Sequence, residues 1–390
     1  MNVLVFVENY VSGGSDLFLK NLLKYNGLNN YTIFYNKNCP PLLYEDFKSS
    51  NNIKLIQYDF ITPNDLFNKS KGSYFSIFYL LYIVLTYPIF LFSIFFFFFK
   101  QKNSKYDLYL INNGGYPGGY CSRAFNISLN IFSKGKKIYH LVHSNPDNYK
   151  PITYFLERYF IDPLVKRNTT FIAVCDFIKK SLIKKRNFKN ITVIKNGVRD
   201  SFKEIDKSQK NFNIIQLASI NKNKNQLLSL KALDILVNKK KYLNIKINFF
   251  GEISDLLYYD RLSIFINKKK LNKHVKFHGL KNDVATELNK SNLLLLTSFV
   301  EGFPLSILEA LSCKIPVIST NTGGVLEQIK SGENGFLLNS FEELELSNFI
   351  ETLYKDKNLC KKIGNINRLR YLKEYTIEDM NNNYKLILKL

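Results

Sequence analysis

Short apolar runs alternate with stretches of helical periodicity along most of the chain. In the first half, the runs typical of strands lie at residues 3–7, 31–35, 53–57, 108–111, 137–142, 170–174 and 191–194. Between them apolar positions recur with the helical period, as at 16–24 and 177–185. Because helices between consecutive strands favour a parallel sheet covered on both faces, this alternation predicts an α/β fold with a doubly wound sheet.

The same alternation starts again after a polar, weakly periodic passage in the middle of the chain. The strands predicted there lie at 213–218, 245–250, 275–277, 293–297, 317–319 and 336–338. A chain of 390 residues also exceeds the length at which one hydrophobic core usually stops growing. We therefore predict domains at 1–200 and 213–375, a linker at 201–212 and a final helical segment at 376–390.

One stretch of the first domain is more apolar than a strand or a surface helix requires. Residues 74–99 contain no formally charged side chain and lie between Lys71 and a lysine cluster that starts at Lys100. Their number is sufficient to cross a bilayer. A single crossing would nevertheless place strands of one sheet on opposite sides of the membrane. Pro88 also divides the run into two helical pieces, each too short for a hydrocarbon core of about 30 Å.

We therefore expect 74–99 to be a kinked or re-entrant element that contacts one leaflet of the membrane, with flanking lysines near lipid phosphates. Two alternatives stay open. The stretch could form a pair of helices buried in the first domain, or it could span the bilayer.

The charge of the chain is strongly positive and uneven. The formal net charge is +23, and residues 1–200 carry 26 Lys and Arg against 12 Asp and Glu. A basic first half suits an acidic partner, either a nucleic acid or an anionic membrane surface. Charge alone does not choose between them.

Cysteine and histidine positions give no sign of a metal centre. The five cysteines are scattered without a Cys-x-x-Cys spacing, which favours reduced thiols in a cytosolic protein. His140 and His143 are close in sequence, but no carboxylate or cysteine completes a familiar ligand pattern. The first residues resemble a strand and lack a basic leader, so we expect the protein to stay on the cytoplasmic side.

The residues most informative about chemistry lie at 298–311, where a buried strand is predicted to turn into a helix. Glu301 falls on the loop after the strand, Pro304 suits the first helical position, and Glu309 lies more than a turn into the helix. N–H groups at such a helix start favour a pyrophosphate. Each carboxylate can accept hydrogen bonds from the hydroxyls of a ribose or a hexose. An isolated pair of glutamates would more often be a solvated helix face.

This motif continues into a Gly-Gly loop at Gly323 and Gly324, and the whole block resembles the family 4 glycosyltransferases of GT-B architecture. The resemblance implies two Rossmann-like domains facing a cleft and a last helix that crosses back onto the first domain. It also implies retention of configuration, a nucleotide-sugar co-substrate, and neither a metal nor another cofactor. By position, Glu301 would bind sugar hydroxyls and Glu309 the ribose. The same stretch contributes the remaining donor-binding positions, which are Gly302, Phe303, Pro304 and Leu305.

The loop after the first strand of the second half also matches the family in part. Lys224 stands at the position of a lysine that neutralises the donor diphosphate, followed by Asn225. Ser219 stands where the family has an arginine, so Lys222 or a helix N-terminus would have to substitute. A fixed cation is useful there because cleavage of the sugar–phosphate bond leaves negative charge on the nucleoside diphosphate.

Two positions of the first half are implied by the same resemblance. Gly13 and Gly14 follow the first strand and would border the donor diphosphate and the acceptor, with Asp16 in place of the family's glutamate. His143 lies at the carboxyl end of a predicted strand and would approach the transferred sugar. Their simpler interpretations are the tight turn that any α/β protein needs and a half-buried core histidine.

The sequence therefore predicts a retaining, metal-independent hexosyltransferase with Glu301, His143 and Lys224 as its catalytic set. The donor would be a nucleotide sugar such as a UDP-sugar. The acceptor would be a membrane-associated glycolipid or a growing polysaccharide of the capsule or lipopolysaccharide type. We expect peripheral or monotopic attachment to the inner face of the cytoplasmic membrane, without a nucleic-acid partner. The alternatives are a nucleotide-sugar epimerase on the same scaffold and a basic nucleic-acid-binding protein, although no binding module for the latter is recognisable.

Overall fold

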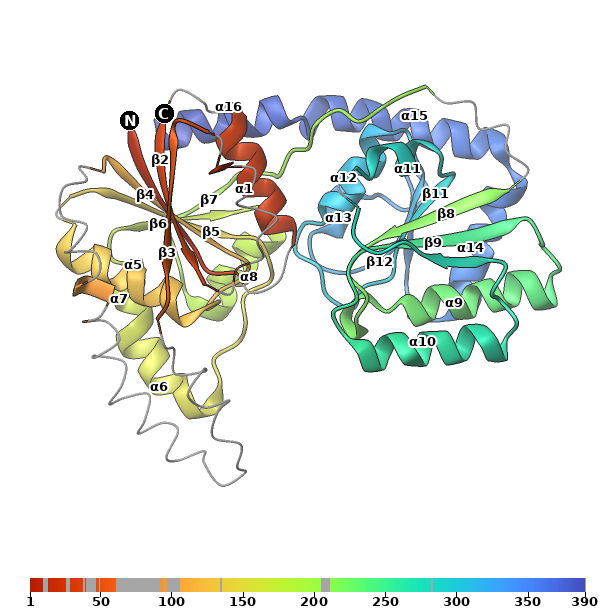
Figure 1. Cartoon of the computed structure of the whole chain (residues 1–390), viewed down its shortest axis with the longest axis horizontal. Helices are drawn as coiled ribbons and strands as arrows, with labels where there is room; N and C mark the ends of the chain where they lie inside the picture. Colours follow the sequence, from red (N-terminus) through yellow and green to blue (C-terminus); the bar gives the residue numbers. More distant parts are fainter. Residues whose placement is uncertain are drawn as a thin grey trace. The chain divides into compact units, whose positions relative to one another are not determined.

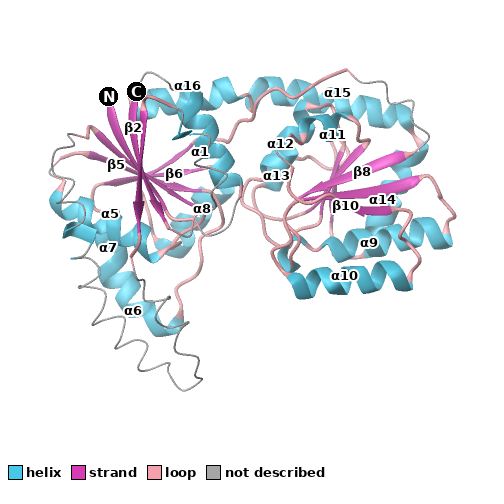
Figure 2. Ribbon diagram, viewed as in Figure 1, coloured by secondary structure: helices cyan, strands magenta, loops and turns pink. Residues whose placement is uncertain are grey.

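The chain folds into two compact units, each built around one parallel sheet (Figures 1 and 2). The first comprises Met1–Lys195 and Asn381–Leu390, and the second Asn196–Met380. The computed structural model describes residues 1–9, 13–25, 29–37, 39, 47–48, 50–60, 92, 94–96, 106–133, 135–204, 211–281 and 283–389. The units are described separately below.

The sheet of the first unit has seven strands in the order β3-β2-β1-β4-β5-β6-β7, all parallel. They are β1 (Asn2–Val7), β2 (Asn30–Asn36), β3 (Ile53–Tyr58), β4 (Leu108–Asn113), β5 (Lys137–Val142), β6 (Thr169–Ala173) and β7 (Ile191–Val193). From β1 the chain adds β2 and β3 on one side of the sheet. It then returns to the other side of β1, where it adds β4, β5, β6 and β7 in sequence order. The boundary between β1 and β4 is thus a switch point, where doubly wound sheets bind ligands at the carboxyl ends of the strands.

Helices connect these strands, as their periodicity predicts. They are α1 (Gly14–Tyr25), α5 (Tyr120–Phe132), η1 (Pro151–Thr153), α6 (Tyr154–Leu156), η2 (Glu157–Ile161), α7 (Asp162–Lys166) and α8 (Asp176–Arg186). The last helix, α16 (Ile377–Leu388), belongs to the first unit from Asn381 onward. There the Tyr139 hydroxyl donates to the Ile387 carbonyl at 2.9 Å, and the Tyr384 ring lies 5.5 Å from that of Phe18.

The sheet of the second unit has six parallel strands in the order β10-β9-β8-β11-β12-β13. They are β8 (Phe212–Leu217), β9 (Ile245–Phe250), β10 (Val275–Phe277), β11 (Leu293–Leu296), β12 (Val317–Thr320) and β13 (Phe336–Leu338). All four leucines of β11 are buried because the strand lies inside a sheet covered on both faces. The switch point of this sheet lies between β8 and β11.

Helices cover both faces of the second sheet. They are η3 (Lys222–Lys224), α9 (Gln226–Asp234), η4 (Ile235–Lys239), α10 (Leu256–Lys268), α11 (Ala285–Asn289), α12 (Leu305–Ser312), α13 (Val325–Gln328), α14 (Glu343–Lys355) and α15 (Lys357–Glu374). Figure 1 shows α9 and α10 side by side on one face of the sheet, with α12 on the other. Apolar side chains of α9, η4, α10, α14 and α15 form one core with those of β8, β9, β11, β12 and β13.

Every predicted strand is present, and its ends differ from the prediction by at most two residues. One detail differs: Pro304 is the residue before α12 and has an extended backbone, so the helix begins at Leu305. The predicted contact of 74–99 with a membrane falls almost entirely outside the described residues. Of its few described residues, Ile94 is buried in the core of the first unit and Phe95 packs 4.0 Å from the ring of Phe132. Among the described helices none is both long and apolar enough to cross a bilayer.

The boundary between the units falls after Lys195, before the predicted linker at 201–212. The residues that follow Lys195 belong to the second unit because they are hydrogen-bonded to the end of α15 and the residue after it. The Val198 N–H donates to the Tyr375 carbonyl at 3.1 Å, and the Tyr371 hydroxyl donates to the Val198 carbonyl at 3.0 Å. A Cβ on Gly197 would lie 2.2 Å from the Thr376 carbonyl oxygen, so only glycine allows this approach. Two chain segments far apart in sequence therefore run side by side in the second unit.

Candidate active site

Three loops meet at the carboxyl edge of the second sheet because the strands that precede them, β8, β11 and β12, are neighbours. The first and second of these loops flank the switch point and carry Lys224 and Glu301. Helices α9, α12 and α13 begin directly after the three loops. Their unpaired N–H groups and dipoles make this edge of the sheet favourable for an anion.

Hydrogen bonds join the loop after β8 to the loop after β11. The Phe299 N–H donates to the Asn223 carbonyl at 2.8 Å, and the Asn223 side-chain amide donates to the Val300 carbonyl at 3.2 Å. Thr297 directly follows β11, and its hydroxyl donates at 3.0 Å to the carbonyls of Lys224 and Asn225. The backbones that carry Lys224 and Glu301 are therefore fixed relative to one another.

The loop after β12 supports the Glu301 loop from its other side. The Gly324 N–H donates to the Gly302 carbonyl at 2.8 Å, and the Thr322 hydroxyl donates to the Phe299 carbonyl at 2.9 Å. Gly323 has a left-handed backbone with φ of +58°, and a Cβ there would lie 1.9 Å from the Glu301 carbonyl oxygen. The Gly-Gly pair thus permits a contact that no larger residue would allow.

Lys224 and Glu301, 77 residues apart in sequence, form an ion pair with 2.7 Å between Nζ and Oε1. Their side chains are only 24% and 10% exposed, so this pair is not a solvated surface contact. Both charged groups are held at the switch point, where doubly wound sheets bind ligands.

Glu309 lies on α12, one turn beyond the Glu301 loop. Its side chain is half-buried and makes no hydrogen bond or ion pair to any residue that the structure describes. Burial raises the pKa of its carboxyl to about 7. A desolvated carboxyl group without partners is costly, and ligand hydroxyls would relieve that cost.

The other predicted donor-binding residues of this unit differ in whether their side chains are accessible to a ligand. Phe303 and Leu305 are buried, and the Phe303 ring lies 6.0 Å from that of Tyr375, so only their backbones remain for a ligand. Asn225 has a left-handed backbone and precedes α9. The Ser219 hydroxyl accepts a hydrogen bond from the Asn221 side chain at 3.0 Å. No described contact supplies a cation at Ser219, which leaves Lys222 and the start of α9 as the nearby positive groups in sequence.

His143 follows β5 in the first unit, and its ring is fixed by two contacts. Its Nε2 lies 2.9 Å from Asn112 Oδ1, and its ring packs 4.7 Å from that of Phe18. The Asn112 amide nitrogen donates to the Ser15 carbonyl at 3.3 Å. Because a carbonyl can only accept, Asn112 must present its oxygen to His143, and Nε2 must carry the proton. Burial lowers the pKa of His143 to about 3, so the ring is neutral and Nδ1 is a hydrogen-bond acceptor.

Gly13 and Gly14 stand at the start of α1, exposed at the carboxyl edge of the first sheet. A Cβ on Gly13 would meet nothing within 4 Å, so the backbone here faces open space. Asp16 is buried and accepts from the Gly13 N–H at 3.1 Å and from Asn9, while burial raises its pKa to about 6. Its carboxyl therefore stabilises its own loop. Ser15 lies inside the first turn of α1.

The sequence did not single out several residues that hold these groups in place. Asn112, Thr297 and Asn223 fix His143 and the two donor-side loops through the hydrogen bonds above. Glu8 accepts from the Ser122 N–H at 2.7 Å and so binds the start of α5. A common signal was present, since Glu8, Asn112 and Thr297 are polar residues at the carboxyl ends of apolar strands.

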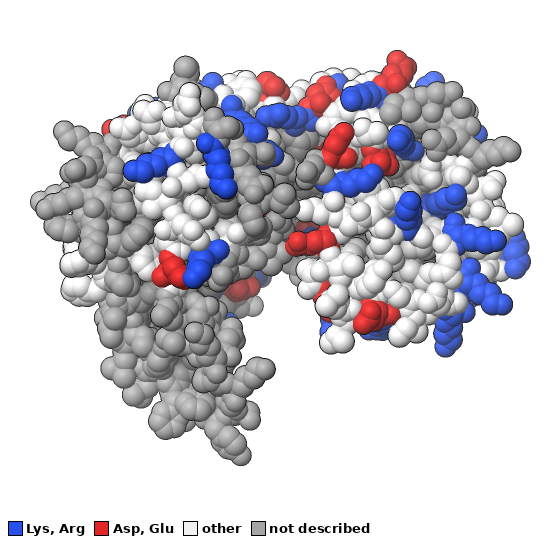
Figure 3. Space-filling view, in the orientation of Figure 1, with Lys and Arg blue, Asp and Glu red and all other residues white. Residues whose placement is uncertain are grey.

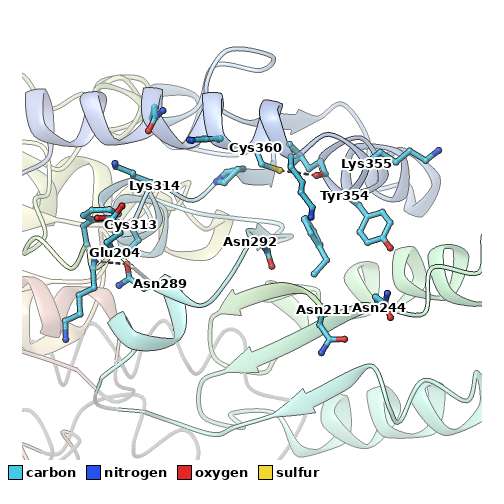
Figure 4. A pocket seen from close by; sticks show the side chains of 18 residues that line it. Glu204, Asn211, Asn244, Asn289, Asn292, Cys313, Lys314, Tyr354, Lys355 and Cys360 are labelled. Carbon is cyan, nitrogen blue, oxygen red and sulfur yellow. Dashed lines mark hydrogen bonds between the residues drawn. The ribbon is translucent and has the colours of Figure 1, made fainter. Parts of the chain in front are cut away.

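A separate cavity of about 750 Å³ lies at the opposite, amino edge of the second sheet. Figure 4 shows Asn211, Asn244 and Asn292, which precede strands, around this cavity with Tyr354 and Cys360. None of the predicted site residues lines it. Among the described residues, no group of three or more His, Cys, Asp or Glu side chains is placed to hold a metal ion.

Two doubly wound parallel sheets, each with a switch point, define the GT-B fold. Solved structures of this class superpose over the full chain, and they include Anabaena HepE in complex with UDP and glucose, at a TM-score of 0.77, 18% identity and 99% coverage of both chains. Staphylococcus aureus TarM, in complex with UDP and saccharides, gives a TM-score of 0.72 at 15% identity and 98% coverage of both chains. At these identities the likeness concerns the fold.

Residues 198–370 match the family model described as glycosyl transferases group 1. The resemblance predicted from the glutamate motif is confirmed. The Bacillus subtilis protein named glycosyltransferase EpsD is 30% identical over 182 residues, 46% of each chain. The capsular polysaccharide biosynthesis glycosyltransferase CapM of Staphylococcus aureus is 26% identical over 261 residues, 60% of this chain and 67% of CapM. The chain spans about half the length of EpsD and of a similar Methanocaldococcus jannaschii protein.

Proposed function

We propose that the chain is a retaining glycosyltransferase that moves a hexose from a UDP-sugar to a hydroxyl of a membrane-held glycolipid or growing polysaccharide. The observation that carries the proposal is the Lys224–Glu301 pair at the switch point of the second sheet, with Glu309 on the helix that follows. The Glu309 carboxyl has no partner among the residues that the structure describes. The UDP complexes of HepE and the role named for CapM support a uridine donor and a polysaccharide product. The basic first half of the sequence supports an acceptor held at an anionic membrane.

In the proposed reaction, Glu309 accepts hydrogen bonds from the ribose and Glu301 from the sugar. The bond between the anomeric carbon and the donor phosphate breaks, and the acceptor oxygen bonds to that carbon on the same face. The departing phosphate takes the acceptor proton. Lys224 and the helix starts stabilise the charge that develops on the diphosphate, so no divalent ion is required. His143 orients the sugar through Nδ1, which accepts a hydroxyl hydrogen.

A thermal-unfolding panel with UDP-, GDP- and ADP-sugars tests donor binding. A ligand at about one hundred times its Kd stabilises the folded state by about 2.7 kcal/mol, and we expect this with a UDP-sugar. An epimerase would also be stabilised, but it would convert the sugar without releasing UDP. Release of UDP that depends on an added acceptor therefore separates the two activities, and protection by RNA alone would refute both.

Substitution of the lysine tests the site itself. Lys224→Met is expected to abolish the UDP-dependent stabilisation, because the diphosphate loses its fixed cation. Lys273→Met is the matched control, since Lys273 is exposed and precedes β10 at the other edge of the sheet. Lys222→Met shows whether that lysine replaces the missing arginine. Equal stabilisation by UDP in the Lys224 and Lys273 variants would contradict the assigned role.

A further inference from the structure

The helical segment at 150–167 of the first unit distributes its side chains in an unusual way. It contains η1, α6, η2 and α7, and α6 extends beyond the edge of the first sheet (Figure 1). A surface helix usually turns apolar residues inward and acids outward. Here both acidic residues of the segment are inside, and a group of aromatic and basic residues is outside.

The two acids are neutralised in the interior of the unit. Glu157 and Asp162 are only 7% and 1% exposed. Glu157 forms an ion pair with the buried Arg186 at 2.7 Å. Asp162 accepts hydrogen bonds from the hydroxyls of Tyr116 and Tyr149 at 2.6 and 2.7 Å. Neither carboxylate is therefore available to repel an anion outside.

The basic residues of the same segment lie on its outer side. Lys150, Arg158 and Arg167 are exposed, and Lys166 is half-buried. On the second unit, by contrast, Lys and Arg are scattered among Asp and Glu over the visible face (Figure 3). The outer side of 150–167 thus carries positive charge without an exposed acid of its own.

Large aromatic rings of the same segment are exposed around Arg158. Phe155, Tyr159 and Phe160 are 67%, 55% and 55% exposed. The ring of Phe155 lies 5.1 Å from that of Tyr159 and 5.8 Å from that of Phe160. The Arg158 guanidinium lies over the rings of Tyr154 and Tyr159, at 5.5 and 5.9 Å from their centres. Exposed aromatic clusters of this kind mark interaction sites.

We propose that this aromatic and basic face, which we call the 150–167 face, docks onto an anionic phospholipid bilayer. A bilayer surface accepts both kinds of side chain, since aromatic rings enter the headgroup region and cations meet lipid phosphates. The inward turn of both acids fits this partner because it removes the negative charges of the segment from the contact. The inference deepens the proposed function by assigning the surface that meets the membrane-held acceptor, but its test uses neither donor nor acceptor.

Vesicle flotation with the full chain tests the proposal. We expect binding to vesicles of phosphatidylcholine mixed with phosphatidylglycerol, weaker binding at high salt, and little binding to phosphatidylcholine alone. Arg158→Glu is expected to weaken binding roughly five-fold or more, because each basic residue near an anionic surface contributes about that factor. The double variant Phe155→Ser with Phe160→Ser is expected to weaken it about tenfold or more, through loss of apolar contact.

The second unit supplies matched controls. Leu256 and Leu257, at the start of α10, are 71% and 81% exposed, so their double change to Ser removes apolar surface elsewhere. Lys273→Glu reverses an exposed cation there. Both controls should bind vesicles like the unmodified chain, and circular dichroism should show all variants folded. If the aromatic double variant still floats like its control, another part of the chain makes the contact and the proposal fails.

The sequence contains no tryptophan, which allows a direct probe of the 150–167 face. In Phe155→Trp the introduced indole is expected to emit at long wavelength in buffer, to shift to shorter wavelength on anionic vesicles, and to be quenched by brominated lipid. Leu257→Trp should show neither change. Emission already at short wavelength without vesicles would mean that the chain itself or a second copy covers this face. Sedimentation velocity separates those two cases, and either overturns the proposal, whereas failed UDP protection would overturn only the proposed transfer.

Discussion

Ionisation of the half-buried Glu309 carboxyl is predicted to lower the stability of the folded protein. Its folded pKa of about 7 exceeds the ordinary value near 4.5, so the folded protein binds more protons than the unfolded chain between these values. Stability contributed by this group is therefore present below pH 4.5 and lost as the pH rises through 7. We expect Glu309→Gln to raise the free energy of unfolding above pH 7 by about 1–2 kcal/mol, after allowance for partial exposure.

The same variant should bind UDP about tenfold or more weakly, because a charged acceptor of ribose hydrogen bonds is lost. Denaturant unfolding between pH 4 and 8 and calorimetric titration with UDP measure the two effects. The stability gain should vanish near pH 4.5. A variant that is stabilised but binds UDP normally would show that Glu309 is a buried acid without a role in donor binding.

Asn112 is predicted to control the protonation of His143. Because its oxygen faces Nε2, the neutral Nε2–H tautomer should persist far below pH 6.5, and long-range ¹H–¹⁵N spectra of the four histidines can show this. In Asn112→Asp, a carboxylate replaces the amide and should raise the pKa of His143 toward or above its ordinary value. Transfer would then acquire a new pH dependence near neutrality.

The second unit provides a control with the same geometry. His278 Nε2 lies 2.9 Å from Asn248 Oδ1, so Asn248→Asp should alter the titration of His278 and leave His143 unchanged.

The neutral state of His143 also affects the stability of the folded protein. Since its folded pKa of about 3 is below 6.5, its contribution is complete above pH 6.5 and is lost as the pH falls toward 3. An Nδ1–H tautomer in the unmodified chain would contradict the whole assignment.

At the scale of elements, the loop after β12 is predicted to hold the Glu301 loop in place. Gly323→Ala should combine the strain of a left-handed alanine, about 1 kcal/mol, with a collision against the Glu301 carbonyl. Gly279→Ala is the matched control, because Gly279 has a similar φ of +68° but open space around it. We expect the first variant to lose more stability than the control and to bind UDP at least about tenfold more weakly. Equal losses in both variants would mean that the loop adjusts freely.

The sequence predicted these elements well where the signal was local. The four leucines of β11 and the Gly-Gly pair are recognisable within a few residues, and the order of motifs assigned Lys224 and Glu301 to one donor site, although not to an ion pair. Side-chain bonds between distant segments had no such signal. Asn112 meets His143 across 31 residues, and Arg186 meets Glu157 across 29, so neither pairing follows from periodicity. For the same reason the inward turn of Glu157 and Asp162, and with it the 150–167 face, became visible only in the structure.

At the scale of the whole molecule, the proposed roles divide between the two units. Lys224, Glu301 and Glu309 belong to the second unit, and Gly13, Gly14 and His143 to the first. The proposed donor binding should therefore depend on the second unit, whereas the proposed transfer should also depend on His143 of the first. The chain passes from one unit to the other at Lys195 and again at Met380, and the segments next to these points are bonded together through Val198 and Tyr375. Changes there should affect the two activities differently.

Gly197→Val tests this division. Its side chain would collide with the Thr376 carbonyl and with Met380, so the bonds between the two crossing segments should break. We expect kcat for transfer to fall about tenfold or more, while the Kd for UDP stays within about twofold, because the donor loops are built by other contacts. Gly332→Ala, at a strained but open position of the second unit, controls for general loss of stability. A folded Gly197 variant with normal kcat would show that the paired crossings do not matter for catalysis. Loss of UDP binding would show that the donor site depends on them directly.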